Sequence, residues 1–210
     1  MNTTHQSPNL NNSSNLASEG PFLTESLANE NLPGEESESG TPNVANIGLG
    51  GQHSILSNLA PTPFTLEGIF FASAEAFIQC IKYPECPKRD RIALLDGYPA
   101  KRAGRKPNAR IRKDLAEGRE AFVHWKGEAI PYRSEAHMKL IETALRAKFG
   151  SSPEAAKALI QTGDAAITHD LGHKENPLTS LPAAVFCDIL TRIREQMVNP
   201  SSPSELVEAS

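Results

Sequence analysis

Apolar and polar positions separate most clearly between residues 73 and 83. Ala74, Phe77, Ile78 and Ile81 are spaced i, i+3, i+4, i+7, which is typical of a helix face that packs against a core. Ser73 is a favoured N-cap residue. This stretch therefore predicts a helix with one buried face, which ends before Pro84.

The same helix has a second, polar face. Glu75, Gln79 and Lys82 are spaced i, i+4, i+7, so a carboxylate, an amide and a cation stack in one row. The helix dipole favours Glu75 in the first turn whatever its function, and it also keeps the carboxylate ionised, as a general base requires. The pattern leaves two interpretations, a solvated surface or one wall of a polar pocket.

Shorter patterns predict the other elements. Apolar runs at 64–66 and 69–71, separated by Glu67-Gly68, indicate a small hairpin. For residues 106–133, which contain Trp125, we expect a helix and an irregular loop. Further helices are predicted over 87–95, 134–149 with Gly150 as its stop, 152–162, and from 182 to about 197.

These elements predict a mainly helical α+β fold with a small β-ribbon. One compact domain is expected over 46–198. Residues 1–45 and 199–210 are polar and show no periodicity. Because such segments cannot bury enough apolar area to offset the entropy of ordering, both are predicted to be disordered tails.

Charge is unevenly distributed along the 210 residues. Residues 1–45 contain six Glu, the last ten residues contain two more, and neither segment has Lys or Arg. Because the whole chain has a net charge of −4, the remaining residues carry a net charge of +4. Within this basic part, Lys101, Arg102 and Arg105 are either a solvated face or a clamp for phosphate, to which Arg offers a bidentate fork.

Several classes of protein are disfavoured. No run of about 18 apolar residues indicates a membrane span, and no basic-then-apolar N-terminal segment indicates a secretory signal. Three cysteines without a C-x-x-C pair favour reduced thiols and a cytoplasmic protein. His169 and His173 have the spacing of a metal-binding pair, but Gly172 weakens the helix that such a site needs. We therefore expect no metal and no cofactor.

Four blocks, in order, resemble the NADAR (YbiA-like) family over about residues 53–195. The first joins Leu-Ser-Asn-Leu-Ala at 56–60 to the helix at 73–82. The others are Ala-Gly-Arg at 103–105, a Met-containing helix that ends in Ala-Lys-Phe at 147–149, and Leu-Ile-Gln-Thr-Gly-Asp at 159–164. The chain departs from the family at 169–178, which lacks a Trp-Gly pair. Trp125 could correspond to the family's tryptophan before the Met-containing helix, and whether it compensates for the missing pair stays open.

The resemblance implies a YbiA-like fold and an N-glycosidase activity. Members of the family cleave phosphorylated early intermediates of riboflavin biosynthesis or remove ADP-ribose from modified guanine. Such a reaction passes through an oxocarbenium-like transition state, which a carboxylate can stabilise. On this basis the candidate catalytic residues are Glu75, Asp164 and Asp170, and the candidate substrate-binding residues are Asn58, Gln79, Lys82, Arg105, Lys148 and Asn176.

Two alternative functions stay open. Without the Trp-Gly pair, the domain could be a non-catalytic module that binds ADP-ribose or a nucleotide. The basic stretch at 88–113 also suits a nucleic-acid-associated protein that acts on ADP-ribosylated DNA. The expected partner is thus a phosphorylated riboside or an ADP-ribosyl group, free or on nucleic acid, and not a membrane. The sequence does not indicate an oligomeric state.

Overall fold

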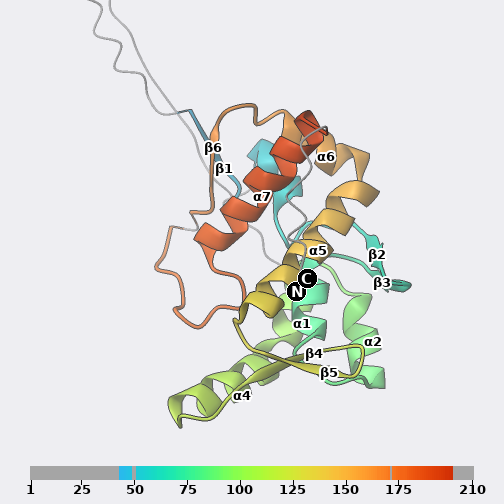
Figure 1. Ribbon diagram of the computed structural model, residues 1–210, viewed down its shortest axis with the longest axis vertical. Coiled ribbons are helices and arrows are strands. Elements are labelled where there is room, and N and C mark those ends of the chain that lie inside the picture. Colours follow the sequence, from blue (N-terminus) through green and yellow to red (C-terminus); the bar gives the residue numbers. More distant parts are fainter. Residues whose placement is uncertain (1–42, 49–50, 171, 201–210) are drawn as a thin grey trace, which may run out of the picture. The chain divides into compact units, whose positions relative to one another are not determined.

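The computed structural model describes residues 43–48, 51–170 and 172–200 (Figure 1). Most of the two tails expected from the sequence, residues 1–42 and 201–210, lies outside the described residues. The chain divides into two units, Met1–Ser39 and Gly40–Ser210, and every described residue belongs to the second. Strand β1, Val44–Asn46, begins within the segment that the sequence assigns to the N-terminal tail.

Helix α1, Ala74–Cys80, is in contact with α2, α3 and α5, which places it at the centre of the described domain. The Ser73 hydroxyl accepts a hydrogen bond from the backbone N–H of Ala76, so the expected N-cap is confirmed. The whole expected apolar face is buried. Gln79 and Lys82 are buried as well, at 4% and 1% exposure, so the polar face of this helix is not a solvated surface.

Two antiparallel hairpins lie close to the aromatic face of α1. β2, Phe64–Leu66, pairs with β3, Ile69–Phe71, as expected from the sequence. β4, Phe122–Trp125, pairs with β5, Glu128–Pro131, where the sequence indicated an irregular loop, so that expectation was wrong. The turn between β4 and β5 is Lys126-Gly127, and both residues have positive φ, as two-residue hairpin turns often require.

Three short helices follow α1 in the chain. They are α2 at Pro87–Ala93, α3 at Gly97–Ala103 and α4 at Arg105–Ala116. α2 starts at the expected proline and ends two residues before the expected Leu95. The basic run is divided between α3 and α4, and Gly104 is the residue between them.

The C-terminal half contains α5, Glu135–Ser151, and α6, Pro153–Ile160. Ser134 and Ser152 cap these helices through their hydroxyls. Gly150 does not end α5, contrary to the expectation, because the helix continues to Ser151 and the next residue caps α6. α7, Ala183–Val198, contacts α6 and strand β6, Ala166–Thr168, and β6 pairs in parallel with β1 (Figure 1). The 3-10 helix η1, Gly51–Leu56, contacts α6.

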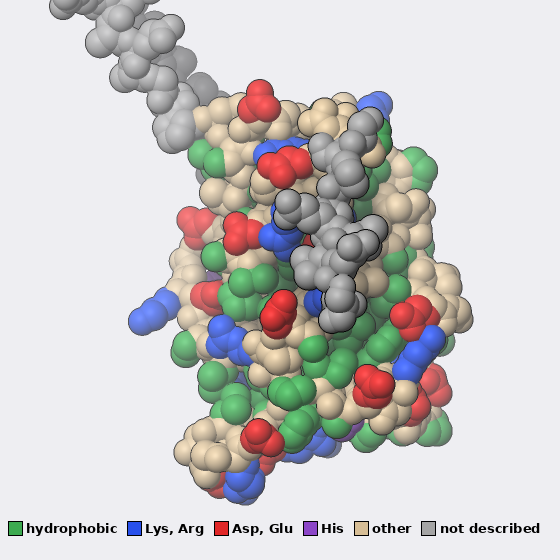
Figure 2. All heavy atoms as spheres, in the orientation of Figure 1, with side chains coloured by type: hydrophobic (Ala, Val, Ile, Leu, Met, Phe, Trp, Pro, Cys, Tyr) green, Lys and Arg blue, Asp and Glu red, His purple; other side chains and the backbone are tan. Residues whose placement is uncertain are grey.

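The described residues therefore form a mainly helical α+β domain, which confirms the expected fold class. It contains three two-stranded sheets within the described ranges, where the sequence indicated one small ribbon. No helix in this part of the chain is long and apolar enough to cross a membrane. Acidic and basic side chains are interspersed over the face shown in Figure 2.

Candidate active site

The row of polar side chains on α1 is a chain of hydrogen bonds. The Gln79 amide donates from Nε2 to Glu75 Oε1 over 2.8 Å, and the Lys82 ammonium donates to Gln79 Oε1 over 2.8 Å. The Lys82 ammonium also donates to Asn108 Oδ1 on α4, again over 2.8 Å. Because each member is held by the next, the Glu75 carboxylate has a fixed orientation. We refer to these four residues as the α1 relay.

Gly104 makes room for the α1 relay. A Cβ atom built at Gly104 would overlap the side-chain amide of Gln79. The glycine is therefore required for the close approach of α1 to the junction of α3 and α4, and not for a special backbone angle, since its φ is −74°. The close packing of these two segments is a physical reason for the Ala-Gly-Arg block at 103–105 to accompany the helix at 73–82.

The α1 relay lines a cavity of about 290 Å³, which we call the polar pocket. Five of the nine candidate site residues from the sequence line it: Asn58, Glu75, Gln79, Lys82 and Asn176. The other four do not: Arg105, Lys148, Asp164 and Asp170. Arg105, Asp164 and Asp170 are exposed, while Lys148 is completely buried.

Lys148 lies beneath the loop that carries Asn58. Its ammonium donates to the carbonyl oxygens of Leu56 and Ser57, over 3.2 and 2.8 Å. The next residue, Asn58, accepts a hydrogen bond at its own carbonyl from the backbone N–H of Glu75 over 2.8 Å. Lys148 therefore holds the backbone that joins the loop to the start of α1. Burial lowers the pKa of Lys148 to about 7.

The side chain of Asn58 has a hydrogen-bond acceptor that is suited to a ligand in the polar pocket. Its Oδ1 atom is buried and has no hydrogen-bond partner among the described residues. A buried acceptor without a partner costs free energy, which a donor on a ligand in the polar pocket would recover. A sugar hydroxyl is such a donor.

The polar pocket also contains side chains outside the nine candidate site residues, although Lys101 belongs to the basic run considered as a phosphate clamp. They are Lys101 on α3, Asn108 and Arg112 on α4, and His169, His173 and Glu175 in the segment before α7. Lys101 and Arg112 belong to the stretch from 97 to 113, which has seven Lys or Arg and no acidic residue, and that imbalance was the available signal. Among the described residues, no group of three or more His, Cys, Asp or Glu could hold a metal ion.

Burial sets the electrostatics of the α1 relay. It lowers the pKa of Lys82 to about 8, against the opposing effect of the nearby Glu75 carboxylate, which raises it. Burial also lowers the pKa of His169, whose ring packs edge-on against Phe186 with the ring centroids 5.5 Å apart. Perturbed titrating groups gathered in one concave site are typical of a catalytic or binding centre.

A family model described as bacteriophage protein GP30.3 matches residues 51–195, which is more than half of the chain. The chain belongs to this family. The family is the NADAR (YbiA-like) family, so the resemblance found in the sequence is confirmed. Among solved structures, the NMR structure of the E. coli protein YbiA is similar, with 17% identity and a TM-score of 0.48 over 80% of this chain and 93% of that chain. No curated protein matches the chain.

This GP30.3 family chain does not use Trp125 to replace the missing Trp-Gly pair in the polar pocket. Trp125 lies in the core at 7% exposure, against Phe71 and Phe77, with ring centroids 6.3 and 5.5 Å apart. Phe77 is on the apolar face of α1, whereas the polar pocket adjoins the face that carries Glu75. Trp125 therefore stabilises the core, and it does not line the polar pocket.

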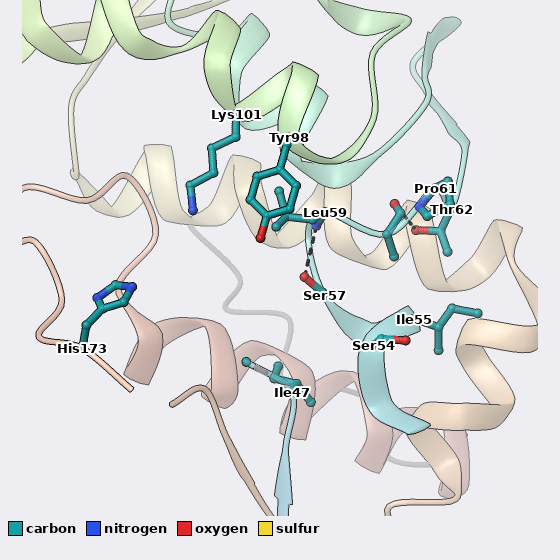
Figure 3. Close-up of a pocket in the computed structure, with 12 residues that line it drawn as sticks. Ile47, Ser54, Ile55, Ser57, Leu59, Pro61, Thr62, Tyr98, Lys101 and His173 are labelled. Carbon is teal, nitrogen blue, oxygen red and sulfur yellow. Dashed lines mark hydrogen bonds between the residues drawn. The ribbon is translucent and has the colours of Figure 1, made fainter. Parts of the chain in front are cut away.

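A second cavity, of about 720 Å³, adjoins the polar pocket of this GP30.3 family chain. Lys101 and His173 line both. Its walls are mainly apolar, with Ile47, Ile55 and Leu59 among them, and Tyr98 projects toward the space (Figure 3). We call it the apolar cavity.

Proposed function

We propose that this protein is an N-glycosidase that hydrolyses the ribosyl–nitrogen bond of a phosphorylated riboside. The observation that carries the proposal is the fixed Glu75 carboxylate on the wall of the polar pocket. Membership of the GP30.3 family supports the same reaction class. The substrate is either an ADP-ribosyl group on guanine or an early phosphorylated intermediate of riboflavin biosynthesis.

Glu75 is suited to the charge that develops in such a reaction. Its Oε1 accepts from Gln79, and its Oε2 has no hydrogen bond to any described residue. Oε2 is therefore free to face the anomeric carbon, where positive charge develops, or to orient the attacking water. Gln79 is occupied on both sides by the α1 relay, so in this proposal it positions Glu75 and does not bind the ribose.

Asn58 and Asn176 are the proposed ligands of the sugar hydroxyls. The unpartnered Oδ1 of Asn58 would accept a hydrogen bond from a hydroxyl. Asn176 Oδ1 accepts from the backbone N–H of Leu178 over 2.9 Å, which fixes the side chain and leaves its NH₂ group as a donor.

Lys101 and Arg112 are the proposed phosphate ligands, together with Lys82. Both are exposed and line the polar pocket, and neither forms an ion pair with another described residue. Arg105 and Lys148, which the sequence favoured for this role, are placed less well, since neither lines the polar pocket. The ammonium of Lys82 has a third proton beyond those given to Gln79 and Asn108, and it can donate to an anion.

Glu175 is the proposed second carboxylate, in place of Asp164 or Asp170. It lines the polar pocket, and its Oε1 accepts from the backbone N–H of Ala183 at the start of α7 over 2.8 Å. This contact holds the side chain beside the N-terminus of α7. Its role would be to bind a hydroxyl or to orient the leaving group.

The test compares Glu75→Gln with Glu154→Gln. Glu154 is the matched control because it also stands in the first turn of a Ser-capped helix, yet it does not line the polar pocket. Each protein is incubated with DNA that carries ADP-ribosylated guanine and, separately, with the phosphorylated riboflavin precursors, and release of base or sugar is measured by mass spectrometry. We expect Glu75→Gln to lose about 10²–10⁴-fold in rate and the control to lose none.

Two results would contradict the proposal. One is a Glu75→Gln variant that keeps the wild-type rate while its thermal unfolding is unchanged. The other is saturable binding of ADP-ribose with no product from any substrate, which would favour the non-catalytic binding module. The placement of Trp125 in the core gives that alternative its support, because no tryptophan of the described residues lines the polar pocket.

A further inference from the structure

The apolar cavity and the polar pocket lie side by side and can be regarded as two compartments of one site. Lys101 and His173 stand at the boundary, because their side chains line both. The polar pocket has two carboxylates, Glu75 and Glu175, whereas the apolar cavity has no carboxylate among its lining residues. A ligand that extends through both compartments would meet polar groups at one end, a cation in the middle and apolar walls at the other end.

Tyr98 gives the apolar cavity a flat aromatic wall. It is 67% exposed, so it contributes little to the core. Tyr98 and Lys101 are three residues apart on α3, and their side chains project in the same direction toward the cavity (Figure 3). Gly97, with a φ of 49°, begins this helix, and a Cβ there would lie 3.5 Å from the carbonyl of Leu59, so the start of α3 packs close to the segment that carries Ser57 and Leu59.

The wall that carries Ser57 and Leu59 is held in place by contacts within the protein. Ser57 Oγ accepts a hydrogen bond from the backbone N–H of Leu59 over 3.2 Å. Lys148 binds the carbonyl of Ser57 from below. The cavity is therefore largely pre-formed, and its volume of about 720 Å³ falls in the usual range for small-molecule sites, roughly 300–1,000 Å³.

We propose that the apolar cavity binds a planar aromatic ring of the same ligand whose ribosyl group occupies the polar pocket. The ring stacks on Tyr98, and an anionic linker between ring and ribose passes Lys101. A flat ring is favoured over an aliphatic chain because Tyr98 offers an exposed π-face, on which any nucleobase-like ring can stack. This inference rests on the proposed function, since it assigns the second part of that ligand.

The experiment measures binding of two probes by isothermal titration calorimetry. ADP-ribose carries a ring, an anionic linker and a ribose, whereas ribose 5-phosphate lacks the ring. We expect Tyr98→Ala to weaken ADP-ribose binding roughly 5- to 100-fold, as the loss of a stacking aromatic does, and to leave ribose 5-phosphate unchanged. Tyr98→Phe keeps the ring and should bind both probes as the wild type does.

Two further variants sharpen the test. Phe70→Ala removes another exposed aromatic, 49% exposed and outside both compartments, and should change neither probe. Ser54→Trp places a large side chain at an exposed position of the cavity wall, and it should reduce ADP-ribose binding while sparing ribose 5-phosphate. Wild-type protein that binds the two probes equally, or a Tyr98→Ala variant that loses both equally, overturns the inference.

Turnover and ring binding are read separately. If ADP-ribose binding depends on Tyr98 but no substrate is cleaved, the glycosidase proposal fails and the aromatic subsite stands. If substrate is cleaved but binding does not depend on Tyr98, the subsite fails and the glycosidase proposal stands.

Discussion

Gly104 is a single residue on which the geometry of the α1 relay depends. In Gly104→Ala the new methyl group would overlap the Gln79 amide, which must then swing away from Glu75 and Lys82. We expect a loss of stability of roughly 1–3 kcal/mol, as for other overpacked sites, and a rate lower by roughly 10²-fold from misplaced groups. Urea denaturation and the base-release assay measure the two effects.

Gly150→Ala is the matched control for that substitution. Gly150 is also helical and has open space around its Cβ position, so alanine there should stabilise α5 by about 0.5–1 kcal/mol and leave the rate unchanged. A Gly104→Ala variant as stable and as active as Gly150→Ala would show that Gln79 has room to move.

Lys148 links stability to pH. Its pKa is about 7 in the folded protein and 10.5 for an unperturbed lysine, so between these values the unfolded chain binds more protons. Stability must then rise with pH across this window, by up to about 1.4 kcal/mol per pH unit. In Lys148→Met this contribution is absent, so the free energy of unfolding should rise less between pH 7 and 9 than in the wild type. The variant should therefore compare most favourably with the wild type at pH 6.

Urea denaturation of both proteins at pH 6, 7, 8 and 9 tests this expectation. The hydrogen bonds lost to Leu56 and Ser57 shift the variant by a constant amount, so only the difference in slope is informative. Lys82, whose pKa burial lowers to about 8, contributes a similar rise to both proteins. If the free energies of unfolding of the two proteins changed with pH in parallel, Lys148 would not be desolvated.

At the scale of single residues, the sequence was informative where spacing along one helix decides the outcome. Glu75, Gln79 and Lys82 share a face because of the helix period, and the structure places them on one wall. Arg105 and Lys148 were assigned to phosphate by residue type, but whether a cation enters a pocket depends on tertiary packing. Lys148 donates to the backbone carbonyl of Ser57 and Arg105 does not line the polar pocket, and no local pattern distinguishes these cases.

At the scale of elements, helices with serine caps were predicted well and strand pairs only partly. Ser73, Ser134 and Ser152 each give a local signal that fixes a helix start. The β2–β3 hairpin has a two-residue turn between apolar runs, so the sequence predicted it. The parallel β1–β6 pair joins residues more than 100 positions apart, and no sequence-local pattern specifies such a pairing.

The segment before α7 forms a wall of the polar pocket, and Tyr132, the residue directly after β5, anchors it. The Tyr132 hydroxyl donates to the carbonyl of Leu178 over 2.9 Å and lies 3.1 Å from Ser180 Oγ. Tyr132→Phe keeps the packing against His137 and removes only these contacts. We expect a loss of about 0.5–1.5 kcal/mol in stability and a raised KM, because the wall carries Asn176 and Glu175.

Steady-state kinetics separates this effect from a catalytic one. Because Tyr132 does not line the polar pocket, its loss should act on substrate binding and leave kcat within a few-fold of the wild type. A variant with unchanged KM would mean that the hydroxyl does not hold the 178–180 wall.

At the scale of the whole molecule, the distribution of basic charge matches the position of the polar pocket. The +4 charge of the chain between its acidic ends is concentrated on α3 and α4, next to the polar pocket. A basic region beside the site raises the local concentration of an anionic ligand. The acidic residues near the N-terminus and C-terminus conceal this imbalance in the net charge of −4.

Strand β1 lies outside the residues that match the GP30.3 family model, yet it belongs to the core of the described domain. Ala45 and Ile47 are 2% and 1% exposed, and the backbone N–H of Ile47 donates to the carbonyl of Thr168 over 2.8 Å. Ile47 and Gly48 also line the apolar cavity. A Cβ at Gly48 would overlap the backbone of Asp170, so this strand end packs tightly against the segment after β6.

Two truncations test the contribution of β1. A chain that starts at residue 43 should keep the wild-type Tm within about 2 °C, because the polar composition of residues 1–42 predicts no contribution to the core. A chain that starts at residue 51 also loses the strand. The burial of Ile47 and the backbone bonds to β6 are together worth roughly 2–4 kcal/mol, so its Tm should fall by about 5–15 °C. Equal Tm values for the two truncations would mean that β1 is dispensable, and calorimetry with ADP-ribose on the shorter chain would then show whether the apolar cavity also survives without Ile47.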